Sequence, residues 1–297
     1  MRFLLFPGQG RPEESLLWRH HQYKSNLLDW IEHRLGRTLS KEDFNDNVAY
    51  SALLVADGLA TWNRYKEVGG RYAGVAGYST GQYTALVAAG CLESEEILEL
   101  VIHRAQLMVQ CTGGGFGMLA VLGMNEDSLR SFIGSFNNRH LHLATKNGPF
   151  SFSVSGANQD LQALKDALES SGAAKKTGFL PVAGAWHSPV LVAAAKRFEE
   201  FVRGYKLKRP KLRFWDNVTG CEVGDEDQIR ENLVRHLTHP VEWDSTIRNM
   251  RLCNPTAWIE CGAGNQLRQM LFFIDRTVPS YGIHSEEEIR KCVELQD

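Results

Sequence analysis

A serine lies between two glycines in Gly77-Tyr78-Ser79-Thr80-Gly81, after a short apolar stretch and before a run with helical spacing. This pattern predicts a strand, a tight turn and a helix, with small neighbours that let the serine adopt a strained backbone conformation. The N-terminus of the helix would stabilise negative charge close to the hydroxyl. Nucleophilic acyl transfer is the chemistry that suits this geometry. A glycine-rich turn with an ordinary serine is the alternative, because the pattern is short.

Two more glycine-rich turns follow expected strands, at Pro7-Gly8-Gln9-Gly10 and at Cys261-Gly262-Ala263-Gly264. The strands before them are the apolar stretches at residues 3–6 and 257–260. In an α/β protein with a parallel sheet, the turns at the carboxyl ends of the strands meet along one edge. We therefore expect the turns near Gln9, Ser79 and Gly262 to meet there and to form the active site.

The pattern changes at residues 113–117, Gly-Gly-Gly-Phe-Gly, which lack the lysine of a phosphate-binding loop and predict a hinge. From there to residue 183 the expected order is strand, helix, strand, strand, helix, strand, with a turn at residues 146–149. That order is ferredoxin-like. We predict a ferredoxin-like α+β subdomain at 117–183, inserted into a core formed by 1–116 and 184–297.

Composition excludes several classes of protein. The chain has 297 residues, of which 43% are hydrophobic and 23% charged, as in a soluble globular protein of more than one unit. A net charge of −2 without a long basic run argues against nucleic acid and anionic membranes as partners. No apolar run approaches the ~20 residues that span a bilayer, and no signal peptide is visible, so we expect a cytoplasmic protein. The six scattered cysteines predict buried thiols and no metal site.

Together with further segments, these motifs form an ordered set. Its members are Pro7-Gly8-Gln9-Gly10, Gly77-Tyr78-Ser79-Thr80-Gly81, Arg104, Trp186-His187-Ser188-Pro189, Asn217-Val218-Thr219-Gly220, His239-Pro240-Val241-Glu242-Trp243 and Glu260-Cys261-Gly262-Ala263-Gly264. The set closely resembles the malonyl-CoA:acyl carrier protein transacylases of fatty acid synthesis and the related acyltransferases of polyketide synthases. The resemblance covers nearly the whole chain. It implies an α/β-hydrolase-like core with a parallel sheet and an inserted ferredoxin-like subdomain, in agreement with the expected elements.

The resemblance implies a mechanism and its partners. Ser79 would attack the thioester of an acyl-CoA while His187 accepts its proton, and the phosphopantetheine thiol of an acyl carrier protein would then take the acyl group. The backbone N–H groups of Gln9 and Thr80 would form the oxyanion hole. No permanently bound cofactor is implied, only coenzyme A thioesters as substrates, and members of the family are commonly monomers.

In the family, the histidine is oriented by a main-chain carbonyl near the position of Glu242 and by an asparagine in the region of Asn147. For His187 a helix cap, and for Asn147 a plain turn residue in Asn-Gly-Pro, are the alternatives. Arg104 lies among apolar positions of an expected helix, where an unpaired guanidinium is costly. The matching arginine of the family binds the free carboxylate of a malonyl group. A salt bridge with Glu99 or Glu95 is the alternative.

Several positions depart from the family pattern. Gln82 stands where glutamate is usual, Tyr50 where a substrate-side glutamine is expected, and Glu242 replaces a glutamine or arginine. Trp186 precedes the histidine as a bulky aromatic residue. We expect Trp186, Tyr50 and Gln82 to line the substrate pocket. These departures favour a discrete, trans-acting acyltransferase of a polyketide or fatty acid pathway over the housekeeping fatty-acid enzyme.

Other functions remain open at this point. The same serine and histidine could pass the acyl group to water, which would make the protein an acyl-thioester hydrolase. The malonyl-transfer subunit of a malonate decarboxylase and a non-catalytic scaffold that binds a carrier protein are further alternatives. A classical esterase would carry its histidine near the C-terminus, whereas about 110 residues follow His187.

Overall fold

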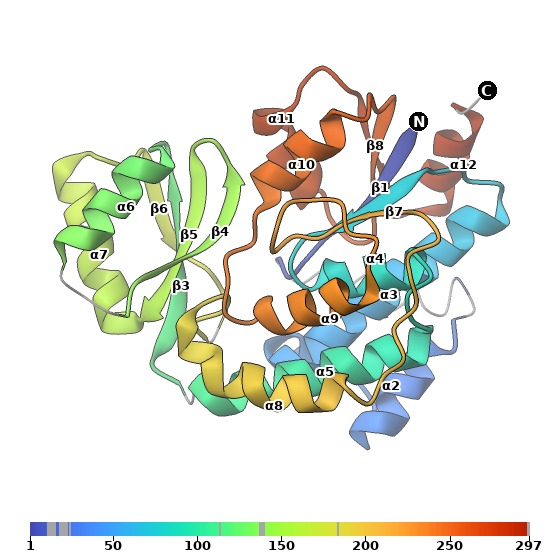
Figure 1. Ribbon diagram of the computed structural model, residues 1–297, viewed down its shortest axis with the longest axis horizontal. Helices are drawn as coiled ribbons and strands as arrows, with labels where there is room; N and C mark the ends of the chain where they lie inside the picture. Colours follow the sequence, from blue (N-terminus) through green and yellow to red (C-terminus); the bar gives the residue numbers. More distant parts are fainter. Residues whose placement is uncertain are drawn as a thin grey trace.

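The computed structural model describes residues 1–10, 16–17, 23, 25–112, 114–136, 140–182 and 184–295. Figure 1 shows a larger part, in which helices surround a parallel sheet, and a smaller part with its own sheet. The strands of the larger part are β1 (Arg2–Phe6), β2 (Gly74–Gly77), β7 (Arg213–Trp215), β8 (Ala257–Cys261) and β9 (Ser280–Ile283). Its helices are α2 (Leu27–Leu35), η1 (Lys41–Asn45), α3 (Asn47–Glu67), α4 (Gly81–Ala88), α5 (Ser94–Thr112), η2 (Pro189–Leu191), α8 (Val192–Val202), α9 (Glu226–Arg235), α10 (Trp243–Arg251), α11 (Gln266–Ile274) and α12 (Glu286–Glu294).

The five strands of the larger sheet are all parallel, in the order β7-β2-β1-β8-β9. The side chains of the central strand β1 are buried from residue 3 to residue 6, because helices cover both faces of the sheet. Phe6 of β1 lies in register with Gly77 of β2, and Leu5 with Glu260 of β8. The three glycine turns therefore start from neighbouring strand ends, and the prediction that they meet at one edge is confirmed.

The smaller part contains β3 (Phe116–Leu122), α6 (Glu126–Ser135), β4 (His142–Gly148), β5 (Ser151–Ala157), α7 (Asn158–Ser171) and β6 (Lys176–Phe179). Its strands are antiparallel, in the order β4-β5-β3-β6. Leucines of α6 and α7 pack on the sheet and form a separate core. The α/β class and the ferredoxin-like order are thus confirmed, while the domain limits at 117 and 183 stay a prediction.

The expected turn at residues 146–149 is wrong, because β4 continues through Lys146 and Asn147 to Gly148. The N–H of Lys146 donates to the carbonyl of Val241 at 2.8 Å, and the N–H of Val241 donates to the carbonyl of Ala144 at 2.9 Å. The Lys146 ammonium also pairs with the Glu242 carboxylate at 2.9 Å. The edge of the smaller sheet is therefore joined directly to the chain that enters α10.

One further expectation, that the cysteines are buried, needs correction. All six cysteines are free, but Cys221 is exposed and only Cys91, Cys261 and Cys292 are buried. The sequence analysis did not place β9, α11 and α12, although Ser285 accepts a hydrogen bond from the N–H of Glu288 and so caps α12. Among the residues that the structure describes, no helix combines the length and apolar character needed to cross a membrane.

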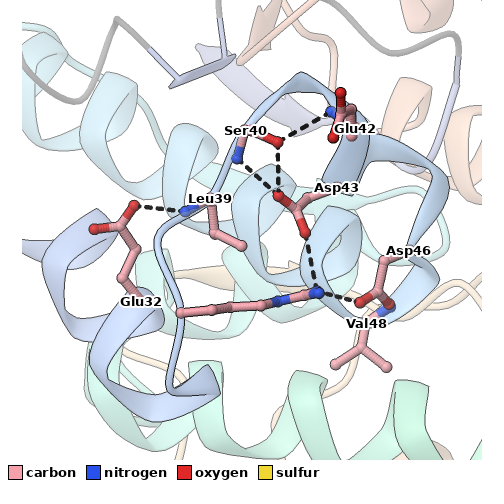
Figure 2. Close-up of polar contacts among 8 residues, drawn as sticks. Glu32, Leu39, Ser40, Glu42, Asp43, Asp46 and Val48 are labelled. Carbon is pink, nitrogen blue, oxygen red and sulfur yellow. Dashed lines mark hydrogen bonds and ion pairs between the residues drawn. The ribbon is translucent and has the colours of Figure 1, made fainter.

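Polar side chains fix the start of α3, the longest helix packed against the sheet (Figure 2). Ser40 and Asp43 cap η1 reciprocally, the Ser40 N–H donating to Asp43 at 2.7 Å. Asp46 then accepts the N–H of Val48 at 2.9 Å and caps α3. Arg37 pairs with both aspartates. Because free N–H groups at a helix start are costly, these caps fix where α3 begins.

We expect Asp46→Ala to lower the free energy of unfolding by about 1 kcal/mol, since the cap of α3 is lost. Asp46→Asn keeps a capping oxygen and loses only an exposed ion pair, so it should cost clearly less. Urea unfolding measures both variants, with Glu200→Ala on the exposed face of α8 as the control. Equal losses for the alanine and asparagine variants would show that the ion pair, and not the cap, holds this end of α3.

Candidate active site

A cavity of about 670 Å³ lies where the edge of the larger sheet faces the smaller sheet. All three glycine turns line it, through Gln9, Ser79 and Gly264 among others. Met118, Ser153 and Phe179 of the smaller sheet form the opposite wall. Gln9, Tyr50, Ser79, Asn147, Trp186 and His187 thus face a common space between the two parts of the chain. Thr80, Gln82, Arg104 and Glu242 are not among the residues that line it.

Ser79 lies at the tip of the turn between β2 and α4, with a positive φ of 50°. Residues other than glycine rarely adopt this backbone region, so the backbone of Ser79 is strained. A Cβ atom on Gly77 would come within 2.2 Å of the Gln82 nitrogen, and one on Gly81 within 2.1 Å of the Phe6 carbonyl oxygen. Only glycine fits at both positions, so the two glycines allow the close turn that presents the serine.

The hydroxyl of Ser79 lies 2.8 Å from Nε2 of His187. Nδ1 of His187 lies 2.8 Å from the carbonyl oxygen of His236. A carbonyl only accepts, so Nδ1 carries the proton and Nε2 of the neutral ring faces the hydroxyl. His187, with a φ of 56°, is also held in the left-handed region. This is the arrangement of a nucleophile and its general base.

The expected orienting groups differ from the observed one. The carbonyl that holds His187 belongs to His236 at the end of α9, not to a residue near Glu242. The backbone carbonyl of Glu242 accepts from Thr246 within α10, while its carboxylate pairs with Lys146. The sequence does not show which backbone carbonyl makes a hydrogen bond. The expected carbonyl, near Glu242, was therefore placed six positions away from the observed one, that of His236.

Asn147 is buried and lines the cavity, but its side-chain oxygen accepts a hydrogen bond from the Tyr78 hydroxyl at 2.8 Å. It therefore links β4 to the residue before Ser79. No hydrogen bond between Asn147 and His187 occurs among the described residues. Asn147 therefore holds Tyr78 of the nucleophile turn, and it does not orient His187 as expected.

Burial lowers the pKa of His187 to about 3, and the positive charge of Arg104 contributes to the decrease. The hydrogen bond to the His236 carbonyl opposes it. The imidazole is therefore neutral at physiological pH and can accept the serine proton. Arg104 reaches this pair only through two rings, since it lies over Tyr83, whose ring neighbours that of His236, which in turn neighbours that of His187.

Arg104 is buried, with 2% of its surface exposed, and stacks over the Tyr83 ring at 5.5 Å. No carboxylate in the described part of the chain pairs with it, and its Nε has no hydrogen-bond partner there. Glu99 pairs with Arg34 instead, so the alternative of an Arg104 salt bridge with Glu99 is wrong. Burial lowers the pKa of Arg104, but a guanidinium stays charged. The site therefore holds an uncompensated buried cation.

The loop around Gln9 is anchored to the first turn of α3. The Gln9 side-chain amide donates to Asn47 and Ser51, at 2.9 Å in both cases. The Tyr50 hydroxyl donates to the Gly10 carbonyl at 3.2 Å. Sequence reasoning missed Asn47 and Ser51, although polar residues at the start of an otherwise apolar helix were a visible signal. The capped start of α3 in Figure 2 thus positions a loop of the cavity.

Two buried carboxylates hold the third turn. Asp57 of α3 accepts the N–H of Ala263 at 3.0 Å. Glu260 accepts the N–H groups of Leu267 and Arg268, which open α11, at 2.9 and 3.1 Å. A carboxylate at a helix N-terminus is a favourable arrangement. These contacts fix the turn against the cavity, and the sequence analysis assigned a role to neither carboxylate.

Of the three expected pocket residues, Trp186 and Tyr50 line the cavity. Gln82 does not, because it is buried behind the nucleophile turn. Its amide nitrogen donates to Asp216 at 2.8 Å, and its oxygen accepts the N–H of Asn217 at 2.9 Å. Gln82 therefore ties α4 to the loop after β7, where a donor is required opposite the Asp216 carboxylate.

The acyl transferase domain family matches residues 42–287, and the chain belongs to that family. The chain is 30% identical to the polyketide biosynthesis protein ThaF of Burkholderia thailandensis, over 91% of this chain and 24% of that protein. It is 26% identical to the polyketide biosynthesis protein PksE of Bacillus subtilis, over 96% of this chain and 39% of that protein. The chain thus spans between a quarter and two fifths of these two relatives.

Other relatives match over most of their own length. The malonyl CoA-acyl carrier protein transacylase of Bacillus subtilis is 26% identical, over 98% of this chain and 95% of that protein. The solved malonyl CoA-acyl carrier protein transacylase of Coxiella burnetii superposes with a TM-score of 0.93 at 25% identity, covering 99% and 96% of the two chains. The acyl-carrier-protein S-malonyltransferase of Burkholderia pseudomallei gives 0.92 at 26% identity, covering 99% of each chain.

The pair of Gln82 and Asp216 yields a prediction about stability. Burial raises the pKa of Asp216 to about 6, although Val218, Thr219 and Gln82 all donate to it. We expect Gln82→Glu to place two carboxylates together and to destabilise the protein by roughly 3 kcal/mol at pH 8. The loss should shrink towards pH 5, where the pair can keep one proton.

The double variant Gln82→Glu/Asp216→Asn restores one donor and one charge, so it should recover most of the stability. Urea unfolding at pH 5 and pH 8 measures all three proteins. If Gln82→Glu were as stable as the wild type at pH 8, the assigned hydrogen bond between residues 82 and 216 would be refuted.

Proposed function

We propose that the protein transfers a malonyl or related dicarboxylic acyl unit from coenzyme A to the phosphopantetheine thiol of an acyl carrier protein. The observation that carries this proposal is a buried Arg104 that no described carboxylate pairs with, linked through the rings of Tyr83 and His236 to the hydrogen-bonded pair of Ser79 and His187. The serine and histidine supply acyl transfer. The unpaired cation selects an acyl group that brings its own carboxylate.

Acylation begins when Oγ of Ser79 attacks the thioester carbon while Nε2 of His187 accepts the hydroxyl proton. The carbon–sulfur bond then breaks, and the proton passes from His187 to the departing thiolate of coenzyme A. In the second half, the carrier thiol gives its proton to His187 and attacks the seryl ester. The carbon–oxygen bond breaks, Ser79 regains its proton, and the carrier leaves with the acyl group.

The backbone N–H groups of Gln9 and Thr80 are suited to bind the oxyanion of both tetrahedral intermediates. No backbone hydrogen bond among the described residues uses either group. Thr80 also stands at the N-terminus of α4, where the helix dipole favours negative charge. One such donor contributes roughly 3–4 kcal/mol to transition-state stabilisation in comparable enzymes.

A bound carboxylate would also act on the base. Burial and, to a smaller extent, Arg104 keep the pKa of His187 low, and an anion beside Arg104 would cancel part of the arginine's charge. His187 would then be a stronger base when a dicarboxylic acyl unit is bound than when the site is free. Substrate selection and proton transfer would thereby be linked through one charge.

Relatives support the choice of acceptor. Several are named as transacylases between malonyl CoA and acyl carrier protein, and two of these are named for polyketide biosynthesis. We infer that this chain works on a separate carrier protein, as a trans-acting enzyme of polyketide or fatty acid synthesis. Transfer to water, which would make it an acyl-thioester hydrolase, is tested by the same experiment.

Intact-protein mass spectrometry tests the reaction. We expect a malonyl adduct after incubation with malonyl-CoA, much less adduct with acetyl-CoA, and discharge on addition of a holo carrier protein. Ser79→Ala should form no adduct. Absence of any adduct would overturn the transferase, equal acetyl and malonyl adducts would overturn the role of Arg104, and faster discharge to water would identify a hydrolase.

The pH dependence of acylation provides a second prediction. Because the neutral form of His187 persists well below pH 6, kcat/KM should not fall between pH 8 and pH 5.5 through this group. Arg104→Met removes a neighbouring positive charge, which raises the pKa of His187. The acid limb measured with acetyl-CoA should then move up by about 1 pH unit.

Arg197→Met is the matched control, since it removes an exposed guanidinium of α8 that contacts Gln110. Its pH profile should equal that of the wild type. An unchanged acid limb in Arg104→Met would show that Arg104 does not influence the base.

A further inference from the structure

His236 occupies a position that its backbone role does not explain. Its carbonyl orients His187, while its imidazole packs with a ring-centroid distance of 4.8 Å from the ring of His187. The Tyr83 ring lies 6.3 Å from the same imidazole, and Arg104 lies over that tyrosine ring at 5.5 Å. The imidazole thus neighbours both His187 and Tyr83, the tyrosine over whose ring the buried guanidinium lies.

The polar atoms of this group lack partners among the described residues. Neither ring nitrogen of His236 has a hydrogen-bond partner there, and the same holds for the Tyr83 hydroxyl and Nε of Arg104. His236 and Tyr83 are fully buried, and Arg104 is buried to 98% of its surface, since 2% is exposed. Buried polar groups are nearly always hydrogen-bonded. Three unpartnered side chains, one of them cationic, together indicate a place for an anion.

We propose that the imidazole of His236 donates a hydrogen bond to the same acyl carboxylate that Arg104 binds, so that it helps the enzyme to select dicarboxylic acyl units. This inference rests on the proposed function. A carboxylate offers about four lone-pair positions, of which a guanidinium fork takes two. A donor beside the fork can therefore bind the remaining positions.

The charge of the site fits this assignment. Burial, followed by the neighbouring His187 and Arg104, lowers the pKa of His236 well below its usual value. The ring is therefore neutral, and a neutral imidazole still carries one N–H group. Arg104 remains the single positive charge of this group, which matches the single negative charge of one carboxylate. His236 thus adds a directional donor without adding a second buried charge.

The test uses side-chain changes that leave the carbonyl of residue 236 in place. His236→Leu removes the donor, and His236→Gln keeps an N–H donor. Single-turnover acylation by malonyl-CoA and by acetyl-CoA is measured for each variant. We expect His236→Leu to lower the malonyl rate by ~10-fold or more relative to the acetyl rate, and His236→Gln to retain most of the preference.

Binding gives a readout that does not depend on turnover. In the Ser79→Ala background, the Kd for malonyl-CoA should rise by a similar factor on adding His236→Leu, whereas the Kd for acetyl-CoA should not. His103→Leu is the matched control, because His103 stands next to Arg104 in the sequence but stacks on Phe201 at 3.8 Å. We expect no change in selectivity for this variant.

Other outcomes separate this inference from the proposed function. Equal losses for both acyl donors would overturn it and show that the ring only supports His187. An unchanged selectivity in His236→Leu would also overturn it, with Asn232, one turn earlier on α9, as the remaining partner for the ring. If the wild type neither reacts with malonyl-CoA nor binds it, the proposed function falls together with this inference.

Discussion

The hydrogen bond between Ser79 and His187 depends on two residues that are both held in the left-handed backbone region. Such positions cost on the order of 1–3 kcal/mol each, so the surrounding structure must enforce them. On the serine side, Gly77 and Gly81 allow contact distances that no Cβ would permit, and Tyr78 is bound by Asn147 of the smaller sheet. On the histidine side, the His236 carbonyl fixes the ring. Sheet edge, smaller sheet and the end of α9 therefore all contribute to one 2.8 Å contact.

The second constraint is charge. Arg104 is buried over the Tyr83 ring, which neighbours His236, and no carboxylate of the described chain neutralises it. Burial and this cation keep the pKa of His187 and His236 low, so both rings stay neutral. The cost of the isolated cation is a property of the free protein that an anionic ligand would remove. A site that is less stable empty than occupied is well suited to discriminate between acyl groups with and without a carboxylate.

Local patterns were sufficient to predict the nucleophile turn, the three strand ends and the ferredoxin-like order, because each depends on short-range periodicity and glycine. What failed depends on contacts distant in sequence. Asn-Gly-Pro looks like a turn, yet Lys146 and Gly148 pair with β5, and the N–H of Lys146 also donates to the Val241 carbonyl, 95 positions later. Gln82 was expected in the pocket, but its amide donates a hydrogen bond to Asp216, 134 positions later. The sequence could not predict that the His236 carbonyl orients His187, because every residue has a backbone carbonyl.

These distant contacts also explain how a divergent sequence keeps the site. Gln82 departs from the usual glutamate, but it satisfies a buried aspartate of raised pKa and the N–H of Asn217, whose side chain in turn donates to the Gly77 carbonyl at 2.8 Å. Glu242 departs as well, and it binds Lys146 of the smaller sheet. Both side chains join separate segments of the chain, and neither lines the cavity. Because Ser79 and His187 keep their hydrogen bond, altered support residues are compatible with retained acyl-transfer chemistry. Trp186 and Tyr50 line the cavity, so changes at such positions would alter which ligand fits.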